Sequence, residues 1–280
     1  MVKSVLITGC SSGIGLALAH GLRARGWRVF ATARKAEDVV RLTDAGFPAV
    51  RLDLADSASI ANAVEEVLAQ TGGRLDALCN NGAYGQPGAV EDLRREVLRE
   101  QFETNLFGTV ELTNRVIPVM RRQGHGRIVQ VSSLLGYVAL PYRGAYTASK
   151  YALEGITDTL RLELAESGIH VVLIEPGPIE SRFRANAFSA YQRNIDKTHS
   201  VHRQRYETME RRLTKPGPAV PFTLPAQAVL AAVRRALEAR RPRTRYRVTL
   251  PATLFWYARR WLPDRWLDAL LLRVAEGETK

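Results

Sequence analysis

Short apolar runs recur along the first two thirds of the chain, and each is followed by residues with helical spacing. The first run spans 5–7, and after it Ile14, Leu18 and Leu22 repeat every four residues, as on one face of a helix. Further runs that predict strands lie at 28–32, 49–52, 75–79, 128–131 and 170–174. Strands that are apolar throughout and alternate with helices predict a parallel sheet covered on both faces.

The longest helical segments between these strands are 102–123 and 146–167. Because parallel strands are joined by right-handed crossovers, this order predicts an α/β fold: a doubly wound, Rossmann-type parallel sheet of about seven strands. Its ligands should bind beyond the carboxyl ends of the strands. A chain of 280 residues can bury one large core, so we expect 1–280 to form a single domain.

The alternation stops near Pro178. Residues 182–224 are rich in arginine and weakly periodic, which indicates a long excursion, and we expect it to form a lid over the substrate. A helix is predicted at 225–239 and a last strand at 245–250. Two amphipathic C-terminal helices should follow within 251–275, separated near Pro263.

Charge is distributed unevenly along the chain. The formal net charge is +12, but residues 1–181 carry 19 Lys and Arg against 20 Asp and Glu, whereas 182–280 carry 21 against 8. A uniformly basic, histone-like body is therefore excluded. The two cysteines, Cys10 and Cys79, cannot make a disulfide framework. With no signal-like segment before the first strand, we expect a cytoplasmic protein.

The first strand is followed by a glycine loop with the pattern TGxxxGxG at 8–15. Glycines allow a tight turn and a close approach of the backbone to a pyrophosphate, which then lies at the N-terminus of the next helix. Many glycine-rich stretches are only turns. The position between a strand and an amphipathic helix favours dinucleotide binding.

The second strand ends at Arg34 and Lys35, with no acidic residue before Glu37. An acidic side chain at this point would hold a ribose 2′-hydroxyl, whereas a guanidinium would hold a 2′-phosphate. We therefore expect NADP(H), with Arg34 at the phosphate and Lys35 assisting. The alternative is that both are solvated surface charges.

Tyr146 and Lys150 are four residues apart, so on a helix they share one face. A nearby ammonium should lower the pKa of the phenol, which can give its proton to a carbonyl oxygen. An exposed helical pair is the alternative. Ser132 and Ser133 follow the strand at 128–131, and periodicity does not decide which of the two hydroxyls would bond the same oxygen.

These features resemble the short-chain dehydrogenase/reductase superfamily. The glycine loop, Asn80-Asn81-Gly82, Asn105, Ser133, Tyr146, Lys150 and Pro176-Gly177 occur in the family's order and spacing within 1–181. The resemblance implies catalysis by Ser133, Tyr146 and Lys150, and it selects Ser133 over Ser132. It also implies that Asn105 holds a water that links Lys150 to solvent, and that Asp53 meets the adenine amino group.

The resemblance further implies a cofactor site. Its members would be Gly9, Ser11, Ser12, Gly13, Ile14, Gly15, Arg34, Lys35, Asp53, Asn81, Gly82, Tyr146, Lys150, Pro176, Gly177, Ile179 and Ser181. Two departures are visible: the family's usual Asn-Asn-Ala-Gly appears as Asn80-Asn81-Gly82-Ala83, and Ser181 stands where a threonine is common. The first exchanges two small residues and the second keeps the hydroxyl, so neither changes the expectation.

Within the superfamily, Ala31-Thr32-Ala33-Arg34 and the segment 174–179 are most similar to the retinol and 17β-hydroxysteroid dehydrogenases and to bacterial NADP-dependent aldehyde reductases. The resemblance implies hydride transfer between nicotinamide and a lipophilic aldehyde, ketone or matching alcohol, with reduction favoured. The alternative is a binding module that senses NADP(H) and docks on a membrane or protein. Expected substrate walls are Tyr84, Leu134, Leu135, Tyr137, Val138, Leu140, Tyr142, Phe183 and Phe188. Because Arg143 is the only cation close to Ser133 in sequence, we expect no anchor for an anionic substrate.

The last segment, 252–275, combines an apolar stripe with Trp261, Trp266 and several arginines. This pattern is typical of an interfacial helix, but we favour a helix pair packed on the core, the pocket mouth or a second subunit. The stripe is too apolar for nucleic acid. We expect a homo-oligomer, a dimer or tetramer. His199 and His202 lack ligand partners at suitable spacing, so no metal site is predicted.

Overall fold

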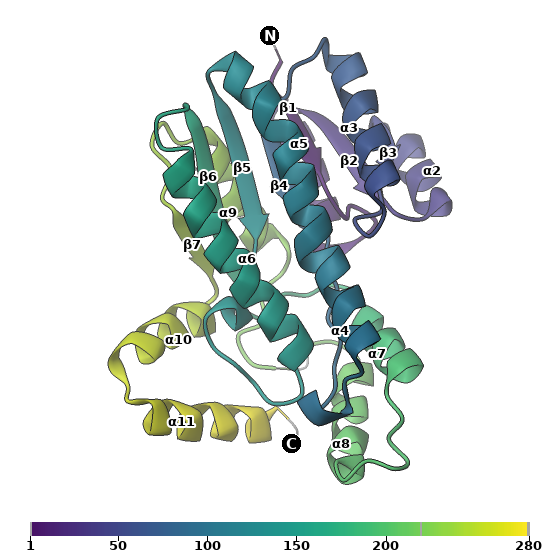
Figure 1. Cartoon of the computed structure of the whole chain (residues 1–280), viewed down its shortest axis with the longest axis vertical. Helices are drawn as coiled ribbons and strands as arrows, with labels where there is room; N and C mark the ends of the chain where they lie inside the picture. Colours follow the sequence, from purple (N-terminus) through teal and green to yellow (C-terminus); the bar gives the residue numbers. More distant parts are fainter. Residues whose placement is uncertain (1, 219, 279–280) are drawn as a thin grey trace.

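The computed structural model describes residues 2–218 and 220–278, and in this part of the chain a seven-stranded parallel sheet forms the centre (Figure 1). The strands are β1 (Ser4–Ile7), β2 (Arg28–Ala33), β3 (Ala49–Arg51), β4 (Ala77–Asn80), β5 (Gly126–Val131), β6 (Ile169–Pro176) and β7 (Arg245–Val248). Their order is β3-β2-β1-β4-β5-β6-β7. The order reverses between β1 and β4, so the predicted doubly wound sheet is confirmed, with its switch point at that place.

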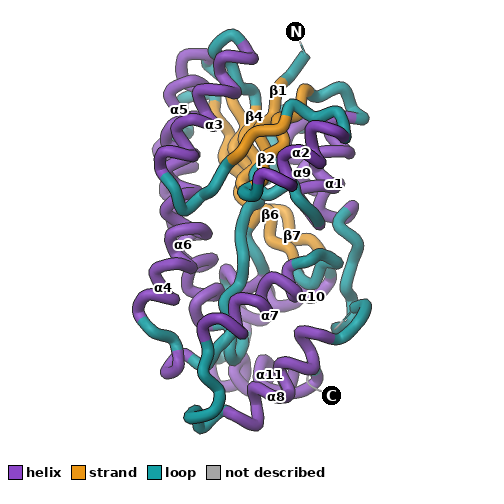
Figure 2. Tube along the Cα trace, turned by 90° about the vertical axis from the view of Figure 1, so that its right-hand side faces the viewer, coloured by secondary structure: helices purple, strands orange, loops and turns teal. Residues whose placement is uncertain are grey.

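Helices cover both faces of the sheet, as Figure 2 shows. One face carries α1 (Gly13–Arg23), α2 (Ala36–Asp44) and α9 (Gln227–Glu238); the other carries α3 (Ser57–Thr71), α5 (Gly108–Gln123) and α6 (Gly144–Glu163). Successive strand residues point to opposite faces. In β1, Val5 and Ile7 belong to the core with α1 and α9, whereas Leu6 belongs to the core with α3 and α5. This two-sided burial explains the continuous apolar runs.

The helix expected at 102–123 is interrupted. Helix α4 (Arg95–Phe102) leads into a π-helical turn at Glu103–Phe107, and α5 continues from Gly108. The π-helical turn widens the helix, and hydrophobic spacing does not reveal such a local change. Asn105 lies in this turn and is buried.

Two strand boundaries also differ from the predictions. Strand β4 begins at Ala77, two residues later than expected, and β7 ends at Val248. Thr249 takes a positive φ of 98° and caps the next helix by accepting a hydrogen bond from the amide of Ala252 at 3.3 Å. Helix α10 (Leu250–Trp261) therefore begins where the strand was expected to continue. It is followed by α11 (Asp264–Gly277) after Pro263.

The segment 182–224 contains two helices in its described part, α7 (Phe183–Asn194) and α8 (Arg203–Thr214). Its pattern appears weakly periodic because α7 buries mainly small side chains, Ala187 and Ala190. The hydroxyl of the buried Tyr206 accepts a hydrogen bond from the amide of Ala89 at 2.9 Å and donates to Asp92. Helices α4, α7, α8, α10 and α11 gather beyond the carboxyl ends of the strands (Figure 1).

Candidate functional site

The glycine loop is joined to the loop that follows β4. The hydroxyl of Thr8 accepts hydrogen bonds from the amides of Asn81 and Gly82 at 2.8 and 2.7 Å. The side-chain amide of Asn81 donates to the carbonyls of Thr8 and Gly9 at 2.9 and 3.3 Å. These bonds bring the two loops together at the switch point of the sheet, where ligands bind in open α/β sheets.

Two glycines make this junction possible. Gly9 has a φ of +73°, and a Cβ there would lie 2.9 Å from the Cα of Gly82; a Cβ on Gly15 would lie 2.1 Å from the carbonyl oxygen of Gly9. Only glycine permits both approaches without strain. The backbone thus forms a close turn that opens α1, and Ser12 at its N-cap makes no side-chain cap. This arrangement fits a dinucleotide pyrophosphate.

A cavity of about 960 Å³ joins this junction to the predicted catalytic residues. Of the predicted site residues, it is lined by Gly9, Ser11, Ser12, Gly13, Ile14, Asn81, Gly82, Ser133, Tyr146, Lys150, Pro176, Gly177, Ile179 and Ser181. Gly15, Arg34, Lys35, Asp53 and Asn105 do not line it. Its size is at the upper end for small-molecule sites.

The residues after β2 and β3 lie outside the cavity. Arg34 and Lys35 are exposed, and Lys35 pairs with Glu37 at 3.2 Å. Burial raises the pKa of Tyr84 to about 12, and Arg193 and Arg34 oppose this rise. The Asp53 carboxylate accepts a hydrogen bond from the amide of Ala55 at 3.0 Å.

One cation near the glycine loop is not among the residues predicted from the sequence. Arg41 on α2 donates to the carbonyl of Ser11 at 3.5 Å and also pairs with Asp38. The sequence offers no sign of this contact, because α2 separates Arg41 from the end of β2 by several residues.

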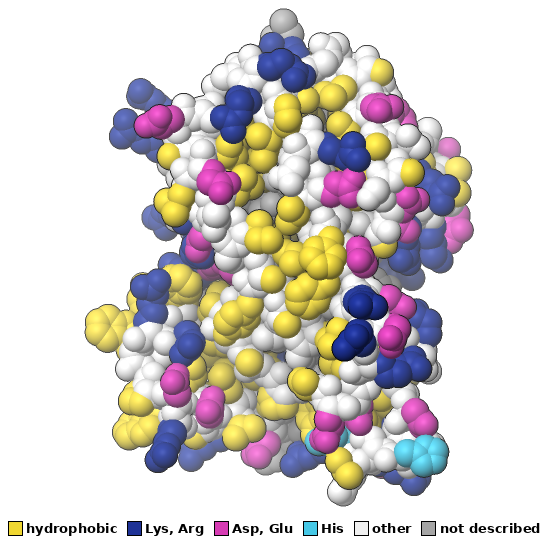
Figure 3. All heavy atoms as spheres, in the orientation of Figure 1, with side chains coloured by type: hydrophobic (Ala, Val, Ile, Leu, Met, Phe, Trp, Pro, Cys, Tyr) yellow, Lys and Arg dark blue, Asp and Glu magenta, His cyan; other side chains and the backbone are white. Residues whose placement is uncertain are grey.

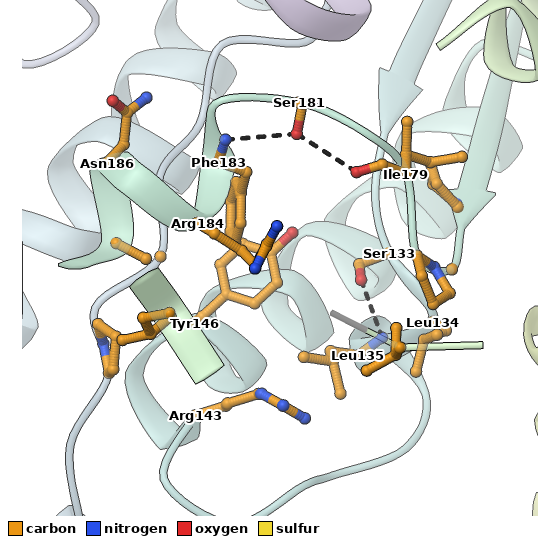
Figure 4. Close-up of a pocket in the computed structure, with 18 of the residues that line it drawn as sticks. Ser133, Leu134, Leu135, Arg143, Tyr146, Ile179, Ser181, Phe183, Arg184 and Asn186 are labelled. Atoms are coloured by element: carbon orange, nitrogen blue, oxygen red, sulfur yellow. Dashed lines mark hydrogen bonds between the residues drawn. The ribbon is translucent and has the colours of Figure 1, made fainter. Parts of the chain in front are cut away.

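The three residues predicted to act on the substrate come from two elements. Ser133 follows β5 and caps the short turn Leu134–Gly136, accepting a hydrogen bond from the amide of Leu135 at 3.1 Å. Tyr146 lies in the first turn of α6, and Lys150 lies one turn later. Figure 4 shows Ser133 and Tyr146 in the same cavity. The ring of Phe183 packs edge-on against Tyr146 with 5.2 Å between centroids.

The pKa of Tyr146 does not move in the direction expected. Burial raises the pKa of Tyr146 to about 12, and the Ser133 hydroxyl opposes the rise. Lys150 donates to the carbonyl of Val131 at 2.8 Å, and its nitrogen lies 5.7 Å from the Tyr146 ring centroid. Its ammonium is therefore bonded to the backbone at the end of β5. Burial also lowers the pKa of Lys150 to about 8, against the attraction of Glu154.

The two serines after β5 have different surroundings. Both line the cavity. Ser133 accepts a hydrogen bond from the amide of Leu135 at 3.1 Å. The Ser132 hydroxyl is buried near the Glu154 carboxyl, and it has no hydrogen-bond partner among the described residues. The selection of Ser133 over Ser132 therefore stays a prediction.

Asn105 occupies a supporting position. Its side-chain oxygen accepts a hydrogen bond from the amide of Tyr84 at 3.1 Å, and its nitrogen donates to the Tyr84 carbonyl at 2.9 Å and to Ser149 at 3.1 Å. Through these contacts the π-helical turn fixes both the β4 loop and α6. The Asn105 side chain thus makes its three hydrogen bonds to protein atoms.

The segment after β6 closes one side of the cavity. The amide of Gly177 donates to the carbonyl of Val248 at 2.9 Å. Ser181 accepts a hydrogen bond from the amide of Phe183 at 3.3 Å and donates to the carbonyl of Ile179 at 3.5 Å (Figure 4). This short turn connects β6 to α7 and leads the chain across the cavity.

The predicted apolar walls are found only in part. Leu134, Leu135, Leu140, Tyr142 and Phe183 line the cavity, whereas Tyr84, Tyr137, Val138 and Phe188 do not. The Tyr137 hydroxyl donates to the carbonyl of Ala252 at 2.6 Å, which ties the loop after β5 to α10. Met209, Leu213 and Leu272 complete the apolar lining from α8 and α11.

Cationic side chains also line the cavity, and their position there was not predicted from the sequence. They are Arg143, Arg182, Arg184, Arg205 and Arg212, together with Lys150. The charge asymmetry showed that 182–224 is basic, but only the packing of α7 and α8 directs these side chains inward. The expectation that an anionic substrate lacks an anchor is therefore wrong.

The two histidines of segment 182–224 have carboxylate neighbours. His199 lies 3.1 Å from Asp196, and His202 lies 2.5 Å from Glu91. This differs from the prediction that neither histidine has a ligand partner at suitable spacing. Among the described residues, no three His, Cys, Asp or Glu side chains come together as a metal site. In the same part of the chain, no helix combines the length and apolar character needed to cross a bilayer.

Comparisons with known proteins agree with the geometry. A sequence profile of the family described as short chain dehydrogenase matches residues 3–192. The chain is 43% identical over 271 residues to the "Uncharacterized oxidoreductase YbbO" of Escherichia coli K12, covering 97% of this chain and 94% of that protein. It is 32% identical over 280 residues to the "NADPH-dependent 3-dehydrocapnine reductase" of Ornithobacterium rhinotracheale, covering 97% of each. A solved short-chain dehydrogenase from Streptomyces avermitilis has a TM-score of 0.76 at 29% identity, covering 99% of this chain and 96% of that one.

Proposed function

Since the chain belongs to the short-chain dehydrogenase/reductase family, we propose that it uses NADPH to reduce lipophilic aldehydes or ketones, and oxidises the matching alcohols in reverse. As a family member it is an oxidoreductase that acts on C=O and CH–OH groups of small molecules with a nicotinamide cofactor. The observation that carries the proposal is that Ser133, Tyr146 and Lys150 line the same cavity as the glycine loop.

Each side chain has a chemical task in this proposal. The bound cofactor supplies the hydride. Tyr146 gives the proton of its hydroxyl to the carbonyl oxygen, and Ser133 donates a hydrogen bond to the same oxygen. Lys150 and Tyr146 hold the nicotinamide ribose. Because burial raises the pKa of Tyr146 to about 12, the phenol is protonated at neutral pH, as a general acid for reduction must be.

The choice of NADP(H) rests on Arg34 and Lys35. Both are exposed at the end of β2, where the adenosine ribose would lie. Arg34 has no carboxylate partner among the described residues, so its guanidinium is available for a 2′-phosphate. A similar protein carries "NADPH-dependent" in its name, which supports the choice. Asp53 would meet the adenine, and Asn105 would support a water that leads to Lys150.

A lipophilic substrate is favoured by the leucine, phenylalanine and methionine side chains of the walls. We assign the lid to α7 and α8, which contribute Phe183 and Met209 to the cavity. Both cysteines, Cys10 and Cys79, are buried thiols without a disulfide, which supports a reducing compartment such as the cytoplasm.

The proposal is tested by NADPH consumption with a panel of aldehydes, ketones and sterols. Turnover with at least one class, and slower turnover with NADH, is expected. The alternative, a module that only senses NADP(H), predicts cofactor binding without turnover of any carbonyl. The position of Tyr146 beside Ser133 in one cavity favours the enzyme, because a sensor has no use for a positioned proton donor.

The C-terminal helices present aromatic residues to solvent. Trp261 and Trp266 are 80% and 70% exposed, and Figure 3 shows hydrophobic and basic side chains together over α10 and α11. In contrast, Trp256 is packed under Arg247 and Arg260, whose guanidinium carbons lie 4.7 and 4.4 Å from its ring centroid. We assign the exposed pair to contact with an anionic membrane surface.

Replacing Trp261 and Trp266 together with serine should weaken binding to anionic vesicles by at least roughly a hundredfold, because each indole loses about 1.5–3 kcal/mol of apolar burial. Co-sedimentation with vesicles of phosphatidylglycerol and phosphatidylcholine measures this. Phe222→Ser removes another exposed aromatic and is the matched control. Wild-type protein that does not bind vesicles of phosphatidylglycerol or of phosphatidylcholine would contradict the assignment.

A second apolar surface lies over α5 and α6 (Figure 3). Phe107 and Ile156 are exposed there and line a shallow hollow together with Val110. We propose that this surface joins two copies of the chain as a homo-oligomer. Ile156→Arg should dissociate the oligomer in light scattering, whereas Val40→Arg on α2, also an exposed site, should not. A wild-type monomer at micromolar concentration would refute this.

A further inference from the structure

Two arginines in the cavity share one carboxylate from the end of the chain. Glu278, directly after α11, pairs with Arg143 and lies 3.5 Å from Arg212. The side chains of Arg143, Arg212 and Glu278 are only 19%, 16% and 15% exposed. The loop before α6, helix α8 and the end of α11 thus meet at one partly buried cluster.

This cluster carries more positive than negative charge. Burial lowers the pKa of Arg212 to about 10, and Arg143 and Arg184 lower it further, while only Glu278 opposes them. Arg184 donates to the carbonyls of Arg212 and Lys215, each at 3.0 Å. Among the described residues, Glu278 is the carboxylate paired with Arg143 and Arg212, and Glu276 lines the same cavity.

The position of the cluster relates it to the catalytic site. Arg143 stands three residues before Tyr146, at the N-terminal end of the same helix, and Figure 4 shows both facing the cavity with Arg184. Arg143, Arg212 and Glu278 all line the cavity that contains Ser133. A molecule whose carbonyl lies at Ser133 and Tyr146 can therefore extend towards Arg143 and Arg212.

Resting on the proposed function, we propose that the preferred substrates carry an anionic group, a carboxylate, sulfonate or phosphate, which replaces Glu278 between Arg143 and Arg212. Guanidinium groups bind such oxyanions through paired hydrogen bonds. Helix α11 is anchored by Leu267 and Leu271, which lie before its last turn. Glu278 can therefore leave the arginines without loss of the helix. Its carboxylate acts as an internal competitor that an anionic substrate displaces.

The test compares two aldehydes of equal chain length, decanal and 10-oxodecanoate, of which only the second bears a carboxylate. The measured quantity is the ratio of their kcat/KM values with NADPH. We expect a ratio above one for wild type, a fall of roughly 10- to 100-fold in Arg212→Met, and a rise of several-fold in Glu278→Gln. Arg211→Met removes an exposed neighbouring charge on α8 and should leave the ratio unchanged. A ratio that is equal in all four proteins overturns the inference.

A binding measurement separates this inference from the proposed function. Octanesulfonate and octanoate, with octanol as the neutral probe, are titrated calorimetrically into protein saturated with NADP⁺. Tighter binding of the anions by Glu278→Gln and weaker binding by Arg212→Met support the site even if neither aldehyde is reduced. Should Arg212→Met fail to fold, the isosteric Glu278→Gln variant decides alone. Anion affinities that do not change in Glu278→Gln overturn the inference, and the two anions show which headgroup fits.

Discussion

Replacing Tyr146 with phenylalanine should lower kcat for carbonyl reduction by roughly 10²- to 10⁴-fold, the usual contribution of a positioned general acid. The substitution removes one oxygen and keeps the ring that packs against Phe183 at 5.2 Å. The fold and the walls of the cavity should therefore persist. Stopped-flow or steady-state NADPH consumption measures the loss, and fluorescence titration with NADPH shows whether cofactor binding remains.

The pH dependence of turnover is a second test of the role of Tyr146. Because burial raises the pKa of Tyr146 to about 12, the acid form prevails throughout pH 6–8, so ionisation of Tyr146 should not change the rate of reduction there. A fall in rate as the pH approaches 8 would report the loss of the Lys150 proton, since burial lowers the pKa of Lys150 to about 8. Alcohol oxidation needs the phenolate, whose fraction rises tenfold per pH unit below the pKa, so its rate should increase with pH. Ser132→Ala is the control, because it removes the neighbouring cavity hydroxyl to which the proposal gives no catalytic task. Near wild-type turnover in Tyr146→Phe would remove Tyr146 from the mechanism.

Arg34→Asp should shift the preference between NADPH and NADH by roughly a hundredfold towards NADH. A charge-assisted contact with a 2′-phosphate contributes about 1.5–3 kcal/mol, and an aspartate in its place repels the phosphate and can bond a ribose hydroxyl. The ratio of kcat/KM for the two cofactors measures the shift. Arg34 is exposed and its side chain does not line the substrate cavity, so the effect should be confined to the cofactor.

Arg74→Asp provides the matched control, since Arg74 is an exposed arginine that precedes β4 at the opposite end of the sheet. It changes the net charge equally and should leave the cofactor ratio unaltered. A ratio that stays the same in Arg34→Asp would refute the phosphate contact and transfer the role to another cation. Arg41, which donates to the carbonyl of Ser11 at 3.5 Å, would then be the next residue to replace.

The strands of the sheet could be predicted from the sequence because each strand is buried on both faces. Val5, Leu6 and Ile7 all lie in cores, so the apolar run is continuous and easily recognised. The π-helical turn around Asn105 left no such trace. Its geometry depends on side-chain bonds from Asn105 to Tyr84 and Ser149, which are distant in sequence.

The candidate site, too, could be predicted from the sequence only where its residues are close together in the chain. The spacing of Tyr146 and Lys150 predicted a shared face, and both line one cavity. The direction in which the pKa of Tyr146 moves depended on burial, which only tertiary packing decides. The cluster proposed to bind an anionic group could not be predicted at all. Arg143, Arg212 and Glu278 come from three separate segments, and only tertiary packing brings them together.

Hydride transfer itself can be measured with NADPH deuterated at C4 of the nicotinamide, in the presence of decanal or another aldehyde that the panel identifies as a substrate. Mass spectrometry of the alcohol product reports whether the deuteron has moved. We expect one deuteron on the carbinol carbon with wild-type protein and almost none with Tyr146→Phe in the same time. Cofactor that binds but transfers no deuterium to any aldehyde, ketone or sterol would contradict the central claim that this chain is a carbonyl reductase.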